Sequence, residues 1–206
     1  MKPIERIMRT APVIPVLVIN KVADAIPIAW ALVDGGLNVL EVTLRTDAAL
    51  EAIAEMTQVE GAIVGAGTVT NPAQLDAVLS AGAQFIVSPG LTESLGQAAI
   101  AADVPFLPGI ANAGDIMRGM DLGLEHFKFF PAVAAGGIPS LKALAGPFGG
   151  CKFCPTGGIT QASMADWLAL SQVLCVGGSW IVPSGPIDSD LIRANAKAVT
   201  RANRPI

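Results

Sequence analysis

The residue best suited to covalent chemistry is Lys128, in the segment His126-Phe127-Lys128-Phe129-Phe130-Pro131. The aromatic and apolar neighbours predict a buried strand that ends at the proline. An ammonium group is costly to transfer from water into such a strand, so burial favours the free amine. A free amine is a nucleophile toward carbonyl carbon, which is the chemistry of Schiff-base enzymes. The alternative is a lysine whose stem packs against the strand while its ammonium reaches solvent.

A carboxylate suited to proton transfer lies in a second apolar segment, Val39-Leu40-Glu41-Val42-Thr43. In a strand, Glu41 and Thr43 point to the same face, and a carboxylate facing an apolar interior is costly unless it is paired or functional. Beside Lys128, Glu41 could act as a general acid and base. The alternative is an ion pair between Glu41 and Arg45 without a catalytic role.

Two glycine pairs predict an anion site, in Thr156–Gly158 and Gly177–Ser179. Glycine lets backbone N–H groups approach an anion closely, and a following helix start adds its dipole. The alternative is that these glycines only form tight turns. The predicted phosphate-binding residues are Gly157, Gly158, Gly178 and Ser179. Arg45 and Thr68 remain as anchors for a substrate carboxylate.

The elements that must position these residues alternate between apolar strands and amphipathic helices, in eight units. The predicted strands are Val13–Ile19, Val39–Leu44, Ala62–Gly65, Phe85–Ser88, Pro105–Leu107, His126–Phe130, Lys152–Cys154 and Val173–Val176. The predicted helices are Ala23–Asp34, Ala48–Met56, Ala73–Ala81, Glu93–Ala101, Ala113–Leu122, Ser140–Ala145, Ala162–Leu168 and Leu191–Ala202. Asp47, Asn71 and Thr92 are expected to cap three of them.

This alternation implies parallel pairing and, at this length, an α/β fold with a single (β/α)8 TIM barrel. In such barrels functional residues gather at the C-terminal ends of the strands. The rival is a doubly wound open sheet, but the turn after Ile19 has no glycine fingerprint. Residues 1–206 form one domain in this interpretation, and Met1–Thr10 forms an extra helix that covers the bottom of the barrel.

Composition excludes several classes of protein. The 206 residues are 52% hydrophobic and carry a formal net charge of −4. No apolar run reaches the roughly 18 residues of a membrane span, and no basic stretch suggests binding to nucleic acid or to an anionic membrane. The surplus of apolar residues is consistent with a subunit interface.

The three cysteines are odd in number, and the N-terminus has no apolar signal segment, so a reducing cytoplasm is expected. Cys151 and Cys154 have CxxC spacing, but with one histidine in the chain and no second CxxC we expect no metal site. Cys154 and Cys175 lie in apolar runs and are expected to be inert core residues.

Taken in order, these motifs resemble the class I 2-keto-3-deoxy-6-phosphogluconate (KDPG) aldolase family over nearly the whole chain. The motifs are Glu-Val-Thr-Leu-Arg-Thr at 41–46, Gly-Ala-Gly-Thr-Val at 65–69, Ser-Pro-Gly at 88–90, Lys-Phe-Phe-Pro-Ala at 128–132, Phe-Cys-Pro-Thr-Gly-Gly at 153–158 and Cys-Val-Gly-Gly-Ser-Trp at 175–180. The resemblance implies cleavage of KDPG to pyruvate and glyceraldehyde 3-phosphate, the closing step of the Entner–Doudoroff route. Many members also cleave 4-hydroxy-2-oxoglutarate.

The resemblance also implies the role of each matching residue. Lys128 would form the Schiff base, Glu41 would shuttle protons, and Arg45 and Thr68 would hold the pyruvyl carboxylate. The phosphate would be bound by Gly157, Gly158 and Ser179, and the pocket would be lined by Pro89, Phe130 and Thr156. Members are homotrimers that need no metal and no cofactor.

Two departures from the family pattern put the substrate range in question. Ala111-Asn112 stand where the family commonly has Ser-Thr, and Val133 stands where it often has Glu. Alternatives to KDPG cleavage are an aldolase for the galactonate epimer or for unphosphorylated 2-keto acids, a non-covalent phosphosugar isomerase, and a non-catalytic phosphosugar-binding barrel.

Overall fold

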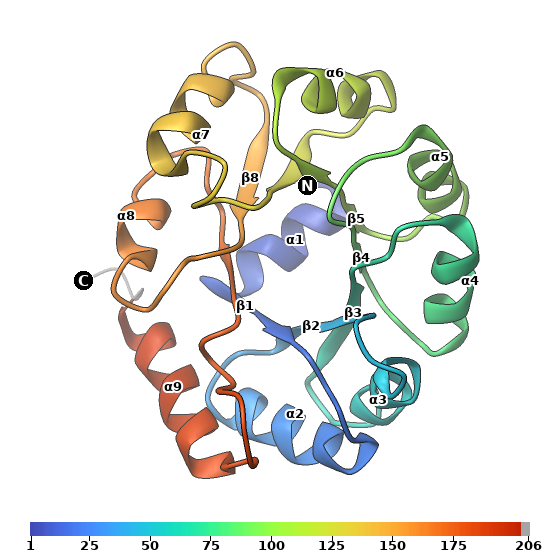
Figure 1. Cartoon of the computed structure of the whole chain (residues 1–206), viewed down its shortest axis with the longest axis vertical. Coiled ribbons are helices and arrows are strands. Elements are labelled where there is room, and N and C mark those ends of the chain that lie inside the picture. The colour runs from blue at the N-terminus through green and yellow to red at the C-terminus, as the bar shows by residue number, and fades with distance from the viewer. Residues whose placement is uncertain (203–206) are drawn as a thin grey trace.

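The computed structural model describes residues 1–202 as an α/β fold in which helices surround a curled parallel sheet (Figure 1). The strands are β1 (Val13–Leu17), β2 (Val39–Thr43), β3 (Ile63–Gly67), β4 (Ile86–Val87), β5 (Phe106–Leu107), β6 (Gly109–Ile110), β7 (His126–Phe129), β8 (Lys152–Pro155) and β9 (Val176–Gly178). The helices are α1 (Pro3–Thr10), the 3₁₀ helix η1 (Val22–Asp24), α2 (Ala25–Asp34), α3 (Ala49–Met56), α4 (Pro72–Ser80), α5 (Glu93–Ala101), α6 (Ala113–Asp121), α7 (Gly137–Ala145), α8 (Met164–Leu168) and α9 (Ser189–Ala202).

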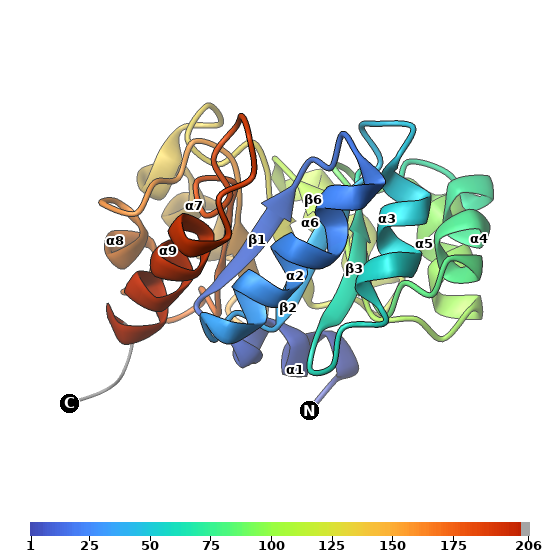
Figure 2. The same ribbon diagram turned by 90° about the horizontal axis from the view of Figure 1, so that it is seen from below.

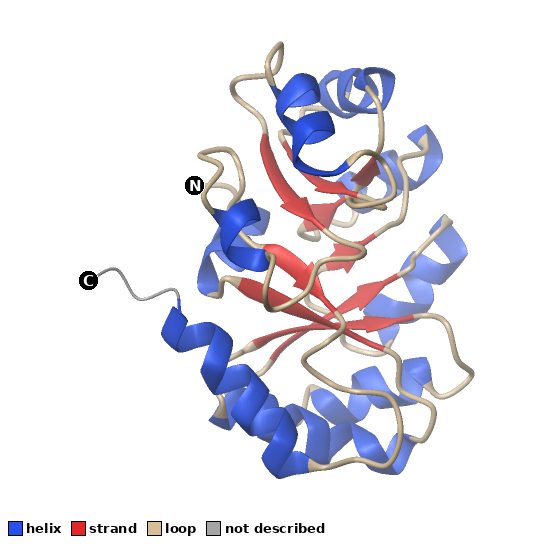
Figure 3. Cartoon of the chain, turned by 60° about the vertical axis from the view of Figure 1, so that its left-hand side comes forward, coloured by secondary structure: helices blue, strands red, loops and turns tan. Residues whose placement is uncertain are grey.

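The strands form one sheet in the order β5-β4-β3-β2-β1-β9 and a second in the order β6-β7-β8. All strand pairs in both sheets are parallel, which confirms the predicted pairing. The order of the elements confirms the predicted alternation of strands and helices. Only Pro108 separates β5 from β6. Figure 3 shows the strands as a curved layer with helices outside it. Because the strands are parallel, their C-terminal ends all lie at the same end of the molecule.

The last strand differs from the prediction. Apolar residues 173–176 were expected to form it, whereas β9 begins at Val176 and includes both glycines that follow. Gly177 pairs with Ile14 of β1, and Gly178 pairs with Pro15. Glycine is usually unfavourable inside a strand. Here, however, the side chain of Thr156 occupies the space beside Gly177, and that of Trp180 occupies the space beside Gly178.

Helix capping was predicted correctly at two of three positions. The side chains of Asn71 and Thr92 accept hydrogen bonds from the N–H groups of Gln74 and Leu95, which stabilises the starts of α4 and α5. The prediction for Asp47 was wrong, because the residue before α3 is Ala48 and that helix has no side-chain cap.

Helix α1 packs at one end of the strands. Its residues Ile4, Ile7 and Met8 are buried in a cluster with side chains from the strands, among them Val87 and Leu107. Figure 2 shows α1 at one end of the strands. This end lies opposite the strand C-termini, so the open end is left for a site. None of the described helices is both long enough and apolar enough to cross a membrane.

His126 is buried next to α1, with 5% of its surface exposed. Its Nε2 is 3.6 Å from Oε2 of Glu5, a residue of that helix. Burial lowers the pKa of His126, and the carboxylate of Glu5 opposes this effect only in part. The charges of Lys2 and Arg9 also lower the pKa of His126, whereas that of Glu125 raises it.

We therefore expect the protein to lose stability as the pH falls below about 6.5, the usual pKa of histidine. The unfolded chain takes up a proton at His126 there, whereas the folded state takes it up only at a lower pH, because its pKa is lowered. Urea unfolding between about pH 7 and 5 should show this slope, and His126→Gln should flatten it. Equal slopes in the two proteins would contradict the assignment.

Candidate active site

The centre of the candidate site is an ion pair between Lys128 of β7 and Glu41 of β2. Lys128 Nζ donates a hydrogen bond to Glu41 Oε1 at 3.1 Å. The two residues are only 5% and 3% exposed. They belong to different sheets and are 87 positions apart in sequence, so the curvature of the fold brings them together.

Both structural alternatives for these residues are wrong. The side chain of Lys128 is 6% exposed, so its ammonium does not extend into solvent. Glu41 pairs with Lys128 rather than with Arg45, which is exposed and has no ion-pair partner among the described residues. A buried ion pair is rarely retained for stability alone, because desolvation of both groups offsets most of their attraction. This arrangement therefore favours a chemical role for the pair.

Lys128 lies on the middle strand of its sheet and close to an aromatic ring. Its strand neighbours in register are Gly109 on β6 and Cys154 on β8. The Nζ atom lies 5.3 Å from the centroid of the Phe130 ring, which is half-buried at the end of β7. The amine is thus held at the C-terminal end of its strand, where a carbonyl substrate entering from the open end could reach it.

Thr68 directly follows β3 and adopts an uncommon backbone conformation. Its φ is +61°, which is strained for a β-branched residue. Such strain is concentrated at functional sites in proteins, and Thr68 lies next to the strand end that faces Glu41. Arg45 lies two residues beyond the end of β2, and β2 is the neighbour of β3 in the same sheet. These two side chains therefore rise from adjacent strand ends.

The two loops of the predicted phosphate site lie beside each other. Gly157 and Gly158 follow β8 with φ of +102° and +78°, a conformation that only glycine adopts easily. Thr156 is joined to Gly177 by a parallel bridge. Ser179, which comes directly after β9, is exposed and lines a cavity of about 630 Å³. Gly178, however, belongs to β9 and not to a loop.

The other predicted pocket residues lie just after β4, β7 and β8. Thr156 is buried and donates to the carbonyl of Cys154 at 3.4 Å. Pro89 is exposed after β4, and its carbonyl oxygen is so close to Gly109 that an added Cβ would lie 2.2 Å away. Phe130 lies against Gly157, where an added Cβ would be 3.4 Å from its ring. These contacts connect the end of β4 with β6, and the end of β7 with the end of β8.

The departures from the family pattern have different structural roles. Asn112 caps α6, because its Oδ1 accepts from the N–H of Asp115 at 3.0 Å. Sequence inspection missed this cap. Val133 is 50% exposed and lies against Gly158. A Cβ added to Gly158 would be 2.7 Å from the Cβ of Val133. Only Val133 therefore lies directly beside the predicted phosphate site.

Cys151, Cys154 and Cys175 are buried free thiols. A hydrogen bond with Cys154, together with burial, raises the pKa of Cys175 well above its ordinary value. The raised pKa favours the protonated thiol, and the burial of Cys154 and Cys175 confirms that they lie in the core. Within residues 1–202, no group of three or more His, Cys, Asp and Glu side chains is arranged to hold a metal ion.

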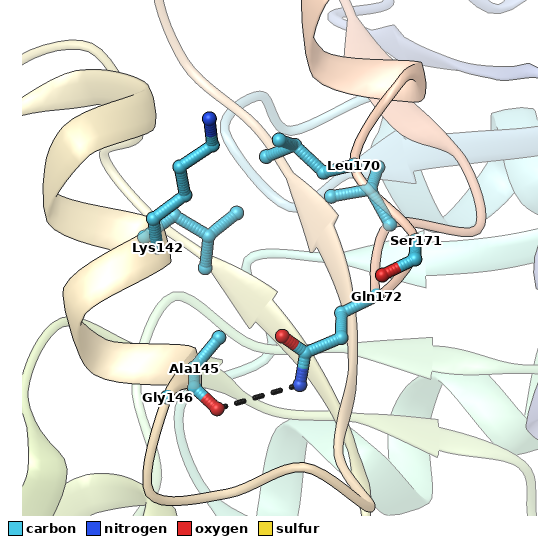
Figure 4. A pocket seen from close by; sticks show the side chains of 8 residues that line it. Lys142, Ala145, Gly146, Leu170, Ser171 and Gln172 are labelled. Carbon is cyan, nitrogen blue, oxygen red and sulfur yellow. Dashed lines mark hydrogen bonds between the residues drawn. The ribbon is translucent and has the colours of Figure 1, made fainter.

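A separate cavity of about 180 Å³ lies between α7 and the segment Leu170–Val173 (Figure 4). Gln172 crosses it and donates to the carbonyl of Ala145 at 3.4 Å, and Lys142 lies at its edge. The lining residues come shortly before β8 and β9 in the chain, so this cavity is at the end opposite to Lys128. It does not belong to the candidate site.

Comparison with known proteins gives consistent results. A family model described as KDPG and KHG aldolase matches residues 4–198. The chain is 57% identical to the 2-dehydro-3-deoxy-phosphogluconate aldolase of Zymomonas mobilis, covering 99% of this chain and 98% of the relative. It is 55% identical to the KHG/KDPG aldolase of Escherichia coli K12, covering 90% and 87% respectively.

Solved structures agree with these sequence matches. The KDPG aldolase of Zymomonas mobilis ZM4, solved with 3-phosphoglycerate, superposes with a TM-score of 0.97 at 57% identity and covers 99% of this chain and 98% of its own. The KDPG aldolase of Legionella pneumophila, with pyruvate captured as a covalent carbinolamine intermediate, gives a TM-score of 0.93 at 46% identity and covers 96% and 98%.

Proposed function

The chain belongs to the KDPG and KHG aldolase family, and from this premise we propose how its own residues perform the reaction. It is a 2-dehydro-3-deoxy-phosphogluconate aldolase, a carbon–carbon lyase acting on a small 2-keto acid. The observation that carries the proposal is the buried contact of 3.1 Å between Lys128 Nζ and Glu41 Oε1. This contact places a nucleophile beside a group that can transfer protons.

In the proposed mechanism, Glu41 takes a proton from Lys128, and the resulting free amine attacks C2 of the 2-keto acid. The carbinolamine loses water with a proton supplied by Glu41, and the protonated imine then attracts electrons from the neighbouring bond. Glu41, directly or through a water molecule, removes the proton of the C4 hydroxyl, and the C3–C4 bond breaks. Glyceraldehyde 3-phosphate leaves, and the enamine is protonated at C3 and hydrolysed to pyruvate. The imine holds the developing charge, so this scheme requires no metal or cofactor.

The remaining site residues would orient the substrate. Arg45 and Thr68 bind the pyruvyl carboxylate in this proposal, supported by their position at adjacent strand ends and by the strain at Thr68. The left-handed conformations of Gly157 and Gly158 support a tight turn whose backbone N–H groups would bind the phosphate. Ser179 adds a hydroxyl donor. Gly178, the last residue of β9, contributes to phosphate binding in this proposal. The pocket is shaped by Pro89, Phe130 and Thr156.

Cleavage assays with three substrates test the function. One preparation is assayed with KDPG, its C4 epimer and 4-hydroxy-2-oxoglutarate, and pyruvate release is measured. We expect KDPG to give the highest kcat/KM and 4-hydroxy-2-oxoglutarate to be cleaved more slowly, because it has no phosphate to bind. Preference for the epimer would favour the galactonate-type alternative. Absence of cleavage of all three would contradict the proposal and favour an isomerase or a binding protein.

Phosphate recognition predicts a selective loss in Ser179→Ala. Removal of a hydrogen bond to a charged group costs about 1.5–3 kcal/mol, or roughly ten- to a hundredfold in kcat/KM. The loss should appear with KDPG and be nearly absent with 4-hydroxy-2-oxoglutarate. Ser171→Ala is the matched control, since Ser171 is exposed and lines the cavity at the opposite end. Equal losses on both substrates would show that Ser179 supports the fold instead of binding phosphate.

We also propose that residues 1–206 form one domain and that the two sheets close into a (β/α)8 barrel. Support comes from the continuity of β5 and β6 across Pro108 and from the bridges that join Phe153 to Val173 and Thr156 to Gly177. Helix α1 would cover the bottom of this barrel, as its buried contacts suggest.

A homotrimer is our proposal for the assembly. Ile26 and Trp30 are exposed, lie four residues apart on one face of α2, and are accompanied by the exposed Leu50 of α3. Such a group of apolar side chains is typical of a subunit interface. A cytoplasmic location is also proposed and is supported by the three free thiols.

A further inference from the structure

Gly67 is the last residue of β3, and the Glu41 carboxylate occupies the space where its side chain would be. An added Cβ would lie 2.2 Å from Oε1 of Glu41, 2.8 Å from its Cγ and 2.9 Å from its Cδ. All three nearest atoms therefore belong to one residue, and that residue pairs with Lys128. Any side chain at this position would compete with the carboxylate for the same volume.

The backbone itself does not require glycine here. Gly67 is not among the residues with positive φ, and it lies in regular parallel pairing with Thr43 of β2. Its carbonyl also accepts a hydrogen bond from the N–H of Leu44 at 2.9 Å. Alanine could adopt this strand conformation, so the closest conflict would be with the Glu41 side chain and not with the backbone.

We propose that Gly67 is a positioning residue for the aldol reaction, one that lets the Glu41 carboxylate lie across the end of β3 and reach Lys128. This inference rests on the proposed function of Glu41 and adds the residue that determines where its carboxylate lies. Strand pairing on both sides holds the backbone of β3, so a methyl group at Gly67 would displace the carboxylate more readily than the strand.

A second glycine of the same strand provides a matched control. Gly65 is directly paired with Glu41 in the strand register, yet an added Cβ there would lie 2.4 Å from atoms of the Phe85 ring. Its conflict is with the apolar core and not with the carboxylate. Comparison of substitutions at the two glycines therefore distinguishes a packing defect in the core from displacement of the Glu41 carboxylate.

The first experiment measures activity in the full chain. Gly67→Ala should lower kcat for KDPG and the exchange of pyruvate C3 protons with deuterium oxide by about 10² or more, the range for loss of general acid–base catalysis. KM should change little, because no binding residue is altered. In the background of Glu41→Gln, the same substitution should cause less than about a twofold further loss, since both changes remove one function. Wild-type activity in Gly67→Ala, or multiplied losses in the double variant, would overturn the proposal.

The second experiment measures stability and remains decisive if Gly67→Ala folds poorly. Gly67→Ala should lower the thermal midpoint of the wild-type protein but not that of Glu41→Ala, in which the conflicting side chain has been removed. Gly65→Ala should lower the midpoint equally in both backgrounds. If Gly67→Ala destabilises Glu41→Ala just as strongly, the glycine serves the fold and the proposal is wrong. Because this cycle needs no substrate, it is independent of whether the wild-type protein cleaves KDPG.

Discussion

Lys128→Arg should abolish aldol cleavage while leaving the protein folded. A guanidinium group keeps its proton at any pH of interest and cannot attack C2 of the substrate. Arginine can still pair with the buried carboxylate of Glu41, so the charge at the site is retained. We expect no pyruvate release above background in a coupled assay, and a circular dichroism spectrum like that of the wild type.

Trapping identifies the lysine directly. Borohydride added in the presence of pyruvate should attach one pyruvyl group to the wild-type chain, and peptide mass spectrometry should locate it at Lys128. Lys142→Arg is the control, because Lys142 is exposed at the cavity opposite the site. This variant should be trapped and remain active. An adduct at Lys142 or Lys152, or no adduct, would refute the assignment of the nucleophile.

The chemistry of the site could be predicted because it depends on residues that are unusual in their local context. A lysine among aromatic residues and a glutamate between apolar residues are both costly to bury, and the structure places them 3.1 Å apart. The alternation of strands and helices then predicted that both would lie at the ends of parallel strands. Their pairing was a prediction from fold class, since nothing in either segment alone specifies its partner.

Features that depend on contacts between strands were harder to predict. The strand assigned to Val173–Val176 in fact begins at Val176 and continues through Gly177 and Gly178. Glycine disfavours strands in general, and its suitability here becomes visible only when Thr156 and Trp180 are seen to fill the space above it. The role of Gly67 was missed for the same reason. A single sequence does not show which side chain occupies the space beside a glycine.

Glu41→Gln should slow the reaction by about 10²–10⁴, the usual contribution of general acid–base catalysis. The amide keeps the shape of the side chain and can still accept a hydrogen bond from Lys128, but it cannot take up the proton of the C4 hydroxyl. Schiff-base formation should slow as well as carbon–carbon cleavage, because loss of water from the carbinolamine also needs a proton donor. The measurements are kcat for KDPG and the rate of pyruvate C3 proton exchange in deuterium oxide.

The control for Glu41→Gln must separate lost chemistry from lost structure, because removal of one partner of a buried ion pair is itself strongly destabilising. Glu51→Gln makes the same chemical change on the exposed surface of α3 and should leave kcat unchanged. A borohydride-trapped adduct at Lys128 in Glu41→Gln, formed slowly but to full extent, would show that the nucleophile remains in place. If proton exchange in that variant continued at the wild-type rate, Glu41 would serve only to neutralise Lys128, and the base would have to be another group at the strand ends.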